Sequence, residues 1–302
     1  MEEPKKTLHQ NTGTVCQDFS FQTAVLYEKS SAAASKPTSG RGTMILKAMQ
    51  KMSTDQAKIT ELLTRSIAEV LPSPEALEKR LQSGERLRVY LGIDPTSPHL
   101  HLGHAAPLLL LRRFQELGHE VILLVGDFTA RIGDPTDKLA ARQPLTEKQI
   151  AENLKTFKKQ AGGLVSFSGK NPARLEFNSK WHDKMTFKEL IELAHHFTVQ
   201  QLEERDMFEK RRRERKPIGL HEFLYPVMQG YDSIELDVDV EVGGNDQLFN
   251  MMAGRTLMKA IKNKEKFVIT TKLLVDAASG KKLSKTERSL VNLDDTPDDM
   301  FG

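Results

Sequence analysis

The sequence predicts an α/β fold in which a doubly wound parallel sheet carries helices on both faces. From residue 86 onward, short β-rich runs alternate with segments of helical spacing. One run, VILLV at 121–125, is continuously apolar, as expected for a strand that helices cover on both faces. Glycine-rich or polar turns follow three of the runs. Strands that alternate with helices form right-handed βαβ units, and these units build a parallel sheet.

The first 55 residues differ in composition from the rest of the chain. Residues 30–43, SSAAASKPTSGRGT, are small and polar and bury too little apolar surface to offset the entropy of ordering. We therefore expect residues 1–55 to be a mostly disordered extension. A transit peptide is the alternative, although acidic residues such as Glu2, Glu3 and Asp18 are unusual in one.

The folded part is expected to begin with two helices, at 57–71 and 73–84. Ser73 is a candidate N-cap, Pro74 suits the first helical position, and Gly84 stands just past the end. The α/β pattern then starts with a strand at 86–93, a helix at 103–118 and a strand at 120–127. Further helices are predicted at 145–160, 184–210, 221–233 and 246–262, and further strands at 174–178, 234–242 and 266–274.

Length and composition narrow the class of protein. A chain of 302 residues suffices for one large or two modest domains. The formal charge of +3 permits a nucleic-acid partner without arguing for one. The single cysteine, Cys16, excludes a disulfide framework within the chain and favours the cytoplasm, with import into an organelle as the alternative. No apolar run approaches the length that crosses a bilayer, so we expect no membrane association.

Three unusual turns fall where predicted strands end. They are GIDPTSPHLHLGH at 92–104, GDFTARIGDP at 126–135 and VGGNDQ at 242–247. In open α/β sheets, ligands bind beyond the carboxyl ends of the strands, and helix N-termini there attract anions. The coincidence of all three turns with strand ends predicts one ligand site.

The histidines of the first turn are candidates for phosphate binding. His101 and His104 flank Gly103 at the predicted start of a helix, where both rings could donate hydrogen bonds to a phosphate. An exposed polar loop is the plain alternative. A metal site with His99 is a further one, but neither a cysteine nor an i, i+4 histidine pair supports it, and we predict no protein-bound metal.

A basic turn near the end of the chain complements these histidines. It reads SGKKLSKTERS and contains Lys282 and Lys285. It is either a solvated basic turn or a mobile loop that brings ammonium groups onto a departing pyrophosphate.

These motifs resemble known signatures. HLGH at 101–104 and KLSKT at 282–286 resemble the HIGH and KMSKS signatures of class I aminoacyl-tRNA synthetases, with Leu102, Leu283 and Thr286 as departures. Together with YLGIDPTSPHLHLGH, LVGDFTARIGDP, HEFLYPVMQGYDS and VGGNDQ, they make the chain from about residue 71 to 302 similar to bacterial-type tyrosyl-tRNA synthetases.

The resemblance implies a domain organisation. Residues 56–302 would form the Rossmann-like nucleotide-binding catalytic domain, with a helical insertion at roughly 138–216 that holds a homodimer interface. The C-terminal tRNA-binding domain of the family is expected to be absent, because the sequence stops at Gly302. A fragment and a natural truncation are both compatible with this end point.

The resemblance also implies a two-step reaction. ATP, bound with Mg²⁺ as its substrate complex, and L-tyrosine would form tyrosyl-adenylate and pyrophosphate. The tyrosyl group would then pass to the 3′ end of tRNA(Tyr). No acid–base or covalent residue is required, because the carboxylate of tyrosine is the nucleophile and catalysis is mainly positioning and electrostatics.

Family positions assign the tyrosine-binding residues. Tyr90 and Asp232 would hold the phenol, and a site built for a hydroxyl rejects phenylalanine because its own polar groups would be left unpaired; synthetases of this type are the usual example of that rule. The other tyrosine-binding residues implied are Asp134, Tyr225 and Gln229 at the ammonium, with Thr129 close by, and Gln247 near the reacting carboxylate.

ATP would occupy the other half of the site. The glycines of this half would allow close backbone approach, and the two aspartates would lie near the adenylate and ribose. The two histidines would bind phosphate oxygens in the transition state, and the two lysines would neutralise pyrophosphate. The residues implied are Gly92, Gly103, Gly243, Gly244, Asp94, Asp246, His101, His104, Lys282 and Lys285.

Three points stay open from the sequence. The basic run KRRRERK at 210–216 is either a solvated helix end or a contact for tRNA phosphates. Another nucleotidyltransferase with an HxGH-type site, or a tryptophanyl enzyme, is the enzymatic alternative, although Tyr90 with Asp232 favours a phenol. A synthetase-derived binding protein without charging activity is the non-enzymatic one.

Overall fold

The computed structural model describes residues 52–135, 145–275 and 291–301. Most of the predicted N-terminal extension, the start of the predicted insertion, and both Lys282 and Lys285 therefore lie outside the described residues. Within the described part, no helix combines the length and the apolar character needed to span a membrane.

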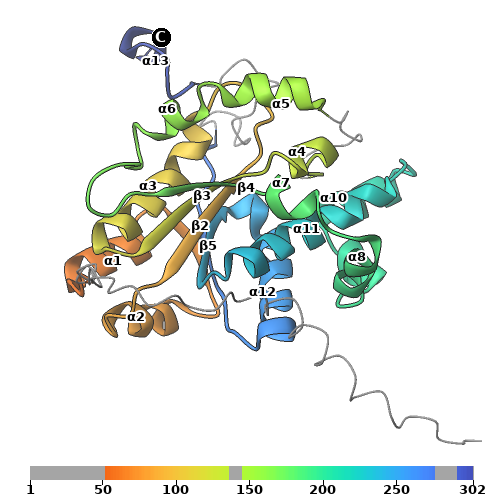
Figure 1. Cartoon of the computed structure of the whole chain (residues 1–302), viewed down its shortest axis with the longest axis horizontal. Coiled ribbons are helices and arrows are strands. Elements are labelled where there is room, and N and C mark those ends of the chain that lie inside the picture. Colours follow the sequence, from red (N-terminus) through yellow and green to blue (C-terminus); the bar gives the residue numbers. More distant parts are fainter. Residues whose placement is uncertain (1–51, 136–144, 276–290, 302) are drawn as a thin grey trace, which may run out of the picture. The chain divides into compact units, whose positions relative to one another are not determined.

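The described strands form one six-stranded sheet. They are β1 (Ile67–Leu71), β2 (Arg88–Ile93), β3 (Glu120–Val125), β4 (Arg174–Phe177), β5 (Val240–Gly244) and β6 (Phe267–Thr271). Their order across the sheet is β1-β6-β5-β2-β3-β4 (Figure 1). Strands β2 to β6 all run parallel to one another. Only the edge strand β1 is antiparallel, and it pairs with β6. The predicted α/β class is confirmed, with an antiparallel edge that the sequence did not indicate.

The strand order contains a switch point. The chain moves outward from β2 through β3 to β4, then returns to place β5 on the other side of β2. Such a reversal opens a crevice beyond the carboxyl ends of the two central strands.

Helices cover both faces of this sheet (Figure 1). On one face, α3 packs against the central strands and α1 packs against α2 and α3, while α11 and α12 pack together on the other face. The described helices are α1 (Gln56–Thr64), α2 (Pro74–Gln82), α3 (Leu102–Leu117), α4 (Thr129–Ile132), α5 (Glu147–Leu154), α6 (Phe157–Ala161), α7 (Ser179–His182), α8 (Phe187–Ala194), α9 (Val199–Glu203), α10 (Asp206–Arg213), α11 (Leu220–Leu236), α12 (Leu248–Lys262) and α13 (Pro297–Phe301), with a 3₁₀ turn η2 (Asn245–Gln247).

Strand alternation divides the core into two layers. Val89, Leu91 and Ile93 of β2 belong to the large cluster under α1, α2 and α3. Tyr90 points to the opposite face and packs with Ile122 and neighbouring apolar side chains. Because successive side chains of a strand face opposite ways, β2 contributes apolar side chains to one layer and the Tyr90 ring with its hydroxyl to the other.

Local signals predicted several elements correctly. Ser73 caps α2 by accepting a hydrogen bond from the Ala76 N–H at 3.2 Å, and Gly84 just past its end has a left-handed φ of 75°. Helix α3 ends at Gly118, whose φ is 97°. Helix α11 continues through Pro226, as expected.

Two predicted elements were wrong. Residues 57–71 are not one helix: α1 stops at Thr64, Ser66 has a left-handed φ of 64°, and β1 pairs with the edge of β6. Residues 234–242 are not one strand, because α11 runs to Leu236 and β5 starts only at Val240. In both cases pairing or packing with distant residues overrode the local pattern.

Two predicted long helices are also broken into shorter ones. Residues 184–210 contain α8, α9 and the start of α10, and residues 145–160 contain α5 and most of α6. At Thr186 and Thr198 the side chains cap α8 and α9 through capping boxes, so each threonine starts a new helix.

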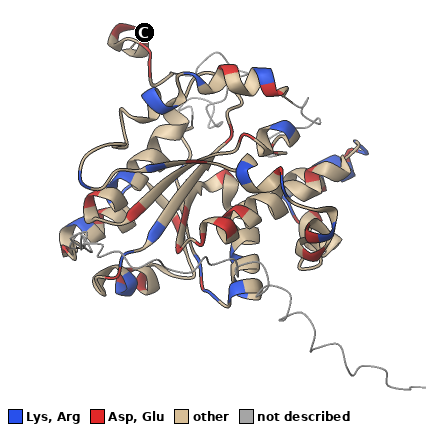
Figure 2. Cartoon of the chain, viewed as in Figure 1, with Lys and Arg blue, Asp and Glu red and all other residues tan. Residues whose placement is uncertain are grey.

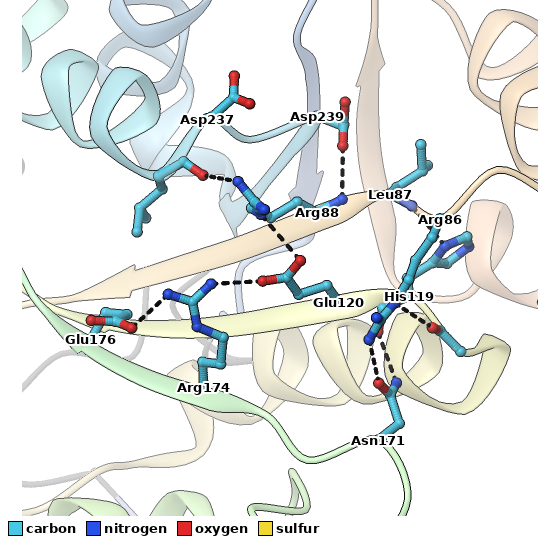
Figure 3. A network of polar contacts seen from close by, with 12 residues as sticks. Arg86, Leu87, Arg88, His119, Glu120, Asn171, Arg174, Glu176, Asp237 and Asp239 are labelled. Carbon is cyan, nitrogen blue, oxygen red and sulfur yellow. Dashed lines mark hydrogen bonds and ion pairs between the residues drawn. The ribbon is translucent and has the colours of Figure 1, made fainter. Parts of the chain in front are cut away.

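A polar network ties the amino-terminal edge of the sheet together (Figure 3). Glu120 at the start of β3 accepts hydrogen bonds from Arg88 of β2 at 3.2 Å and Arg174 of β4 at 2.7 Å, while the Arg88 N–H donates to Asp239 at 2.8 Å. Partial burial raises the pKa of Glu120, but Arg174 and Arg88 outweigh it and hold the pKa below its usual range. This edge is closed by ion pairs, which leaves the carboxyl edge for a ligand site.

Candidate active site

A cavity of about 600 Å³ lies beyond the carboxyl ends of β2 and β5, at the switch point. Every candidate site residue that the structure describes lines it. Those residues are Tyr90, Gly92, Asp94, His101, Gly103, His104, Thr129, Asp134, Tyr225, Gln229, Asp232, Gly243, Gly244, Asp246 and Gln247. The sequence therefore identified the walls of one cavity, while the role of each residue stays a prediction.

One end of the cavity is built around Asp232. This carboxylate is 3% exposed, and its Oδ1 accepts hydrogen bonds from Trp181 Nε1 and His182 Nε2, both at 2.8 Å. Its Oδ2 accepts from Asn178 Nδ2 at 3.3 Å. Three donors thus fix the carboxylate group in a pocket where burying it unpaired would be costly.

Tyr90 lies at the same end. Its side chain is fully buried, and its hydroxyl lies 3.1 Å from Ser233 Oγ. Burial, reinforced by the negative charges of Glu241 and Asp232, raises the pKa of Tyr90 well above its usual value. Tyr90 therefore keeps its proton and remains available as a hydrogen-bond donor.

A second carboxylate cluster is centred on Asp94. Its two oxygens accept hydrogen bonds from Thr129 Oγ1 at 2.7 Å and from the Tyr225 hydroxyl at 2.9 Å. Desolvation raises the pKa of Asp94 to about 7, more than these two donors lower it. The resemblance placed Asp94 near the adenylate and ribose, whereas its contacts join it to residues expected around the ammonium.

Close backbone approach makes this cluster possible. A Cβ added to Gly126 would lie 1.9 Å from Asp94 Oδ1 and 2.4 Å from Thr129 Oγ1. Only a glycine at this position lets the turn after β3 lie against the Asp94 carboxylate.

Asp134 connects the cavity to the inserted helices. Its carboxylate accepts from Gln247 Nε2 at 2.6 Å and from Arg205 NH2 at 3.1 Å. Asn250 donates to Gln247 Oε1 at 3.0 Å and so orients the amide. Arg205, just before α10, was not predicted, and it provides a positive charge that keeps the Asp134 side chain in place.

The two histidines form the start of α3. His101 is the N-cap: its Nδ1 accepts from the Gly103 N–H at 3.1 Å, and its own backbone N–H donates to His104 Nδ1 at 3.1 Å. The two rings lie 4.0 Å apart. Because both Nδ1 atoms act as acceptors, the proton of each neutral ring lies on Nε2, and each ring can donate from that atom. His99 instead pairs with Asp294 at 3.1 Å and is not part of the cavity wall.

Sequence reasoning missed several polar residues in the cavity wall and behind it: Asn178 and Glu241 line the cavity, whereas Trp181, His182 and Lys266 do not. Asn178 follows directly after β4, so the strand-end rule that found the other turns could have found it. Trp181 and His182 lie on α7, a helix too short to show a periodic pattern. Glu241 and Lys266 belong to runs predicted as strands, and no local signal marks them as partners.

No group of three histidine, cysteine or acidic side chains in the described ranges could hold a metal ion. The cavity wall instead contains several carboxylates together with the two histidines at the start of α3. Carboxylates and amides suit a ligand with an ammonium and a hydroxyl, and a helix N-terminus with two imidazole donors suits phosphate oxygens.

Comparison with known proteins gives a consistent result. The family model for class I tRNA synthetases (W and Y) matches residues 82–301. A tyrosine–tRNA ligase of Carboxydothermus hydrogenoformans is 44% identical over 247 residues, covering 80% of this chain and 59% of that protein. This chain spans about three-fifths of the length of the curated relatives it matches.

Solved structures are similar in fold. A tyrosyl-tRNA synthetase from Archaeoglobus fulgidus, determined in complex with L-tyrosine, superposes with a TM-score of 0.65 at 26% identity, covering 80% of this chain and 71% of that one. A C-terminally truncated mitochondrial tyrosyl-tRNA synthetase from Coccidioides posadasii gives a TM-score of 0.62 at 28% identity, covering 75% and 69%.

Proposed function

The chain belongs to the class I tRNA synthetases (W and Y), and from that premise we propose that it activates L-tyrosine with ATP and transfers the tyrosyl group to the 3′ end of tRNA(Tyr). The observation that carries the proposal is the single cavity lined by both sets of predicted residues, those for an amino acid and those for a nucleotide. Family membership also argues against an unrelated HxGH-type nucleotidyltransferase.

In the first step, a carboxylate oxygen of tyrosine attacks the α-phosphorus of ATP. A new P–O bond forms, the bond to the bridging oxygen of the β-phosphate breaks, and pyrophosphate leaves with the electron pair. Asp232 and Tyr90 would hold the phenol, while Asp134, Tyr225 and Gln229 would surround the ammonium. The carboxylate is thereby held near the phosphorus, and this positioning lowers the entropic part of the barrier.

His101 and His104 would stabilise the charge that develops on the phosphates. Their Nε2–H groups are donors fixed in advance by the Nδ1 contacts, so no reorganisation is needed as charge builds. ATP would enter with Mg²⁺ as its substrate complex. Lys282 and Lys285, in the basic turn outside the described residues, would neutralise the departing pyrophosphate.

In the second step, a hydroxyl of the terminal tRNA ribose attacks the tyrosyl carbonyl carbon and AMP leaves. The C-terminal end of α10 is a candidate contact for tRNA phosphates, because its last turn consists of Lys210, Arg211, Arg212 and Arg213 (Figure 2). Arg211 is buried against Glu222, so its neighbours would make the contact.

We also propose that the chain acts as a homodimer through the inserted region, 138–216, and the adjoining start of α11. Large apolar side chains are exposed there: Phe187, Ile191, Val199 and Leu220. An exposed group of this kind is typical of a surface that another chain covers. The proposal assigns residues 56–302 to the catalytic domain and places the protein in the cytoplasm, with organellar import as the alternative.

The test is amino-acid-dependent exchange of labelled pyrophosphate into ATP. We expect exchange with tyrosine, and exchange that is slower by several orders of magnitude with phenylalanine or tryptophan at equal concentration. Exchange that tryptophan supports better than tyrosine would assign the chain to the other half of the family. A folded sample that exchanges with none of the three would refute the adenylation step.

A further inference from the structure

A buried ion pair joins the cavity wall to the core behind it, and the proposed reaction gives it no task. Glu241 lines the cavity, whereas Lys266 does not. Lys266, just before β6, has no exposed surface, and Glu241 on β5 is 2% exposed. The Lys266 ammonium donates to the Glu241 carboxylate, to Ser233 Oγ at 2.9 Å and to the Met251 carbonyl oxygen at 3.1 Å. All three ammonium donors therefore have acceptors, as a charge buried this deeply requires.

This arrangement fixes a direction of hydrogen bonding toward the phenol end. A lysine ammonium only donates, so Ser233 Oγ must accept from Lys266. The Ser233 hydroxyl proton is then free to donate to the Tyr90 oxygen, 3.1 Å away. With its oxygen serving as the acceptor, Tyr90 keeps its own proton to donate, to the Glu241 carboxylate in the free protein or to a ligand in the cavity that Tyr90 lines. The Lys266 ammonium also lies 5.9 Å from the centre of the Tyr90 ring.

The same pair orients the amine end. The second oxygen of Glu241, Oε1, accepts a hydrogen bond from Gln229 Nε2 at 3.0 Å. This contact points the amide nitrogen of Gln229 toward Glu241, and we infer that its carbonyl oxygen faces the cavity that Gln229 lines. A carbonyl oxygen is an acceptor, which is what an ammonium group needs.

A helical glycine provides the space for the pair. A Cβ added to Gly254 on α12 would lie 2.3 Å from Lys266 Nζ and 2.6 Å from Ser233 Oγ. A glycine inside a helix is less favourable than an alanine, so this position gives up helix stability and gains room for the network.

We propose that Lys266 and Glu241 are positioning residues for the amino-acid substrate: through Ser233 they make Tyr90 a donor, and through Gln229 they present an acceptor. This inference rests on the proposed function, since it concerns how that site reads tyrosine. The phenol oxygen of tyrosine would accept a hydrogen bond from Tyr90, and its O–H would donate one to Asp232. Phenylalanine leaves both partners unpaired, so a fixed direction at Tyr90 sharpens the discrimination.

The direct test breaks one link and keeps the ion pair. In Ser233→Ala, Lys266 retains Glu241 and the Met251 carbonyl, while Tyr90 loses its directing partner. We expect kcat/KM for tyrosine in pyrophosphate exchange to fall about tenfold. We expect kcat/KM for phenylalanine and the KM for ATP to change less than about twofold. The ratio between tyrosine and phenylalanine then falls about tenfold, which a general loss of structure would not produce.

A double variant tests the Lys266–Glu241 ion pair itself. Lys266→Met with Glu241→Gln removes both charges but leaves an acceptor for Gln229. The matched control is Arg211→Met with Glu222→Gln, which makes the same chemical change at a second buried ion pair. Neither Arg211 nor Glu222 lines the cavity. The first double variant should lower the tyrosine-to-phenylalanine ratio about tenfold or more, and the control should leave the ratio unchanged.

The outcomes separate the two levels of the argument. A wild-type chain without tyrosine-dependent exchange overturns the proposed function and this inference with it. If the wild type is active and folded Ser233→Ala keeps the same tyrosine-to-phenylalanine ratio of kcat/KM, the positioning role of Lys266 and Glu241 is overturned and the proposed function stands. An equal loss of the ratio in the Arg211 control would show a general effect of core damage and would also overturn that positioning role.

Discussion

Replacing Asp94 by asparagine should stabilise the free protein and damage its activity. The carboxyl lies at the cavity wall between Thr129 and Tyr225, and its pKa is raised from 3.8 to about 7. A folded-state pKa above the unfolded value means that the native state prefers the protonated acid. The stability associated with that proton is present at low pH and is lost as the pH rises through 7.

The size of the effect follows from these two pKa values. Between pH 5 and pH 8 the unfolded carboxyl is ionised throughout, while the folded one loses its proton. Linkage then lowers the free energy of unfolding of the wild type by about 2.5 kcal/mol over this interval. Because Asp94 lines an open cavity, solvent screening reduces the value, and we expect about 1–2 kcal/mol. An asparagine side chain does not titrate, so the Asp94→Asn variant should lack this loss.

The assay is urea unfolding of both proteins at pH 5 and pH 8 without ligands. The Asp94→Asn variant should gain stability relative to the wild type as the pH rises, with an unchanged m-value. Glu120→Gln is the control, because the pKa of Glu120 is lowered and its stabilising contribution is lost only at a pH below this interval. The difference in stability between Glu120→Gln and the wild type should therefore be the same at pH 5 and at pH 8. A difference between wild type and Asp94→Asn that stays constant from pH 5 to pH 8 would refute the reasoning.

Three further predictions follow from the same contacts. His104→Ala should lower the exchange kcat by about 10²–10³-fold while the tyrosine dissociation constant, measured by equilibrium dialysis, stays within about twofold; an equal loss of affinity would contradict a transition-state role. Gly254→Ala, which would normally strengthen a helix, should lower the thermal midpoint because its Cβ meets Lys266 Nζ; calorimetry showing a rise would contradict this. Phe187→Glu with Ile191→Glu should convert a dimer to monomer in light scattering, and a dimer that persists would place the interface elsewhere.

The sequence brought together the residues of one cavity wall more accurately than it predicted the helices and strands around them. Parallel strands end at one edge of a sheet, so three turns at strand ends had to meet, whatever the details of the helices between them. Tyr225, Gln229 and Asp232 could be grouped because they recur at helical spacing and α11 is indeed a helix.

The errors arose where distant pairing decided the outcome. The segment 57–71 has helical spacing, yet Ile67–Leu71 pairs with the edge of β6, more than 190 residues later. Lys266 and Glu241 meet because β5 and β6 are neighbours in register, with Glu241 opposite Val268. The register between two strands cannot be read from the residues of either strand alone. The contacts of Lys266 with Glu241 could therefore be found only from the structure.

The most direct test of the central claim is to look for the adenylate itself. The chain would be mixed with ATP, Mg²⁺ and tyrosine in the presence of pyrophosphatase, and the retained small molecules identified by mass spectrometry after gel filtration. The account predicts tyrosyl-adenylate bound to the wild type, none with phenylalanine, and a large loss in His104→Ala. A folded wild type that retains tyrosine and ATP but never forms the adenylate would contradict it.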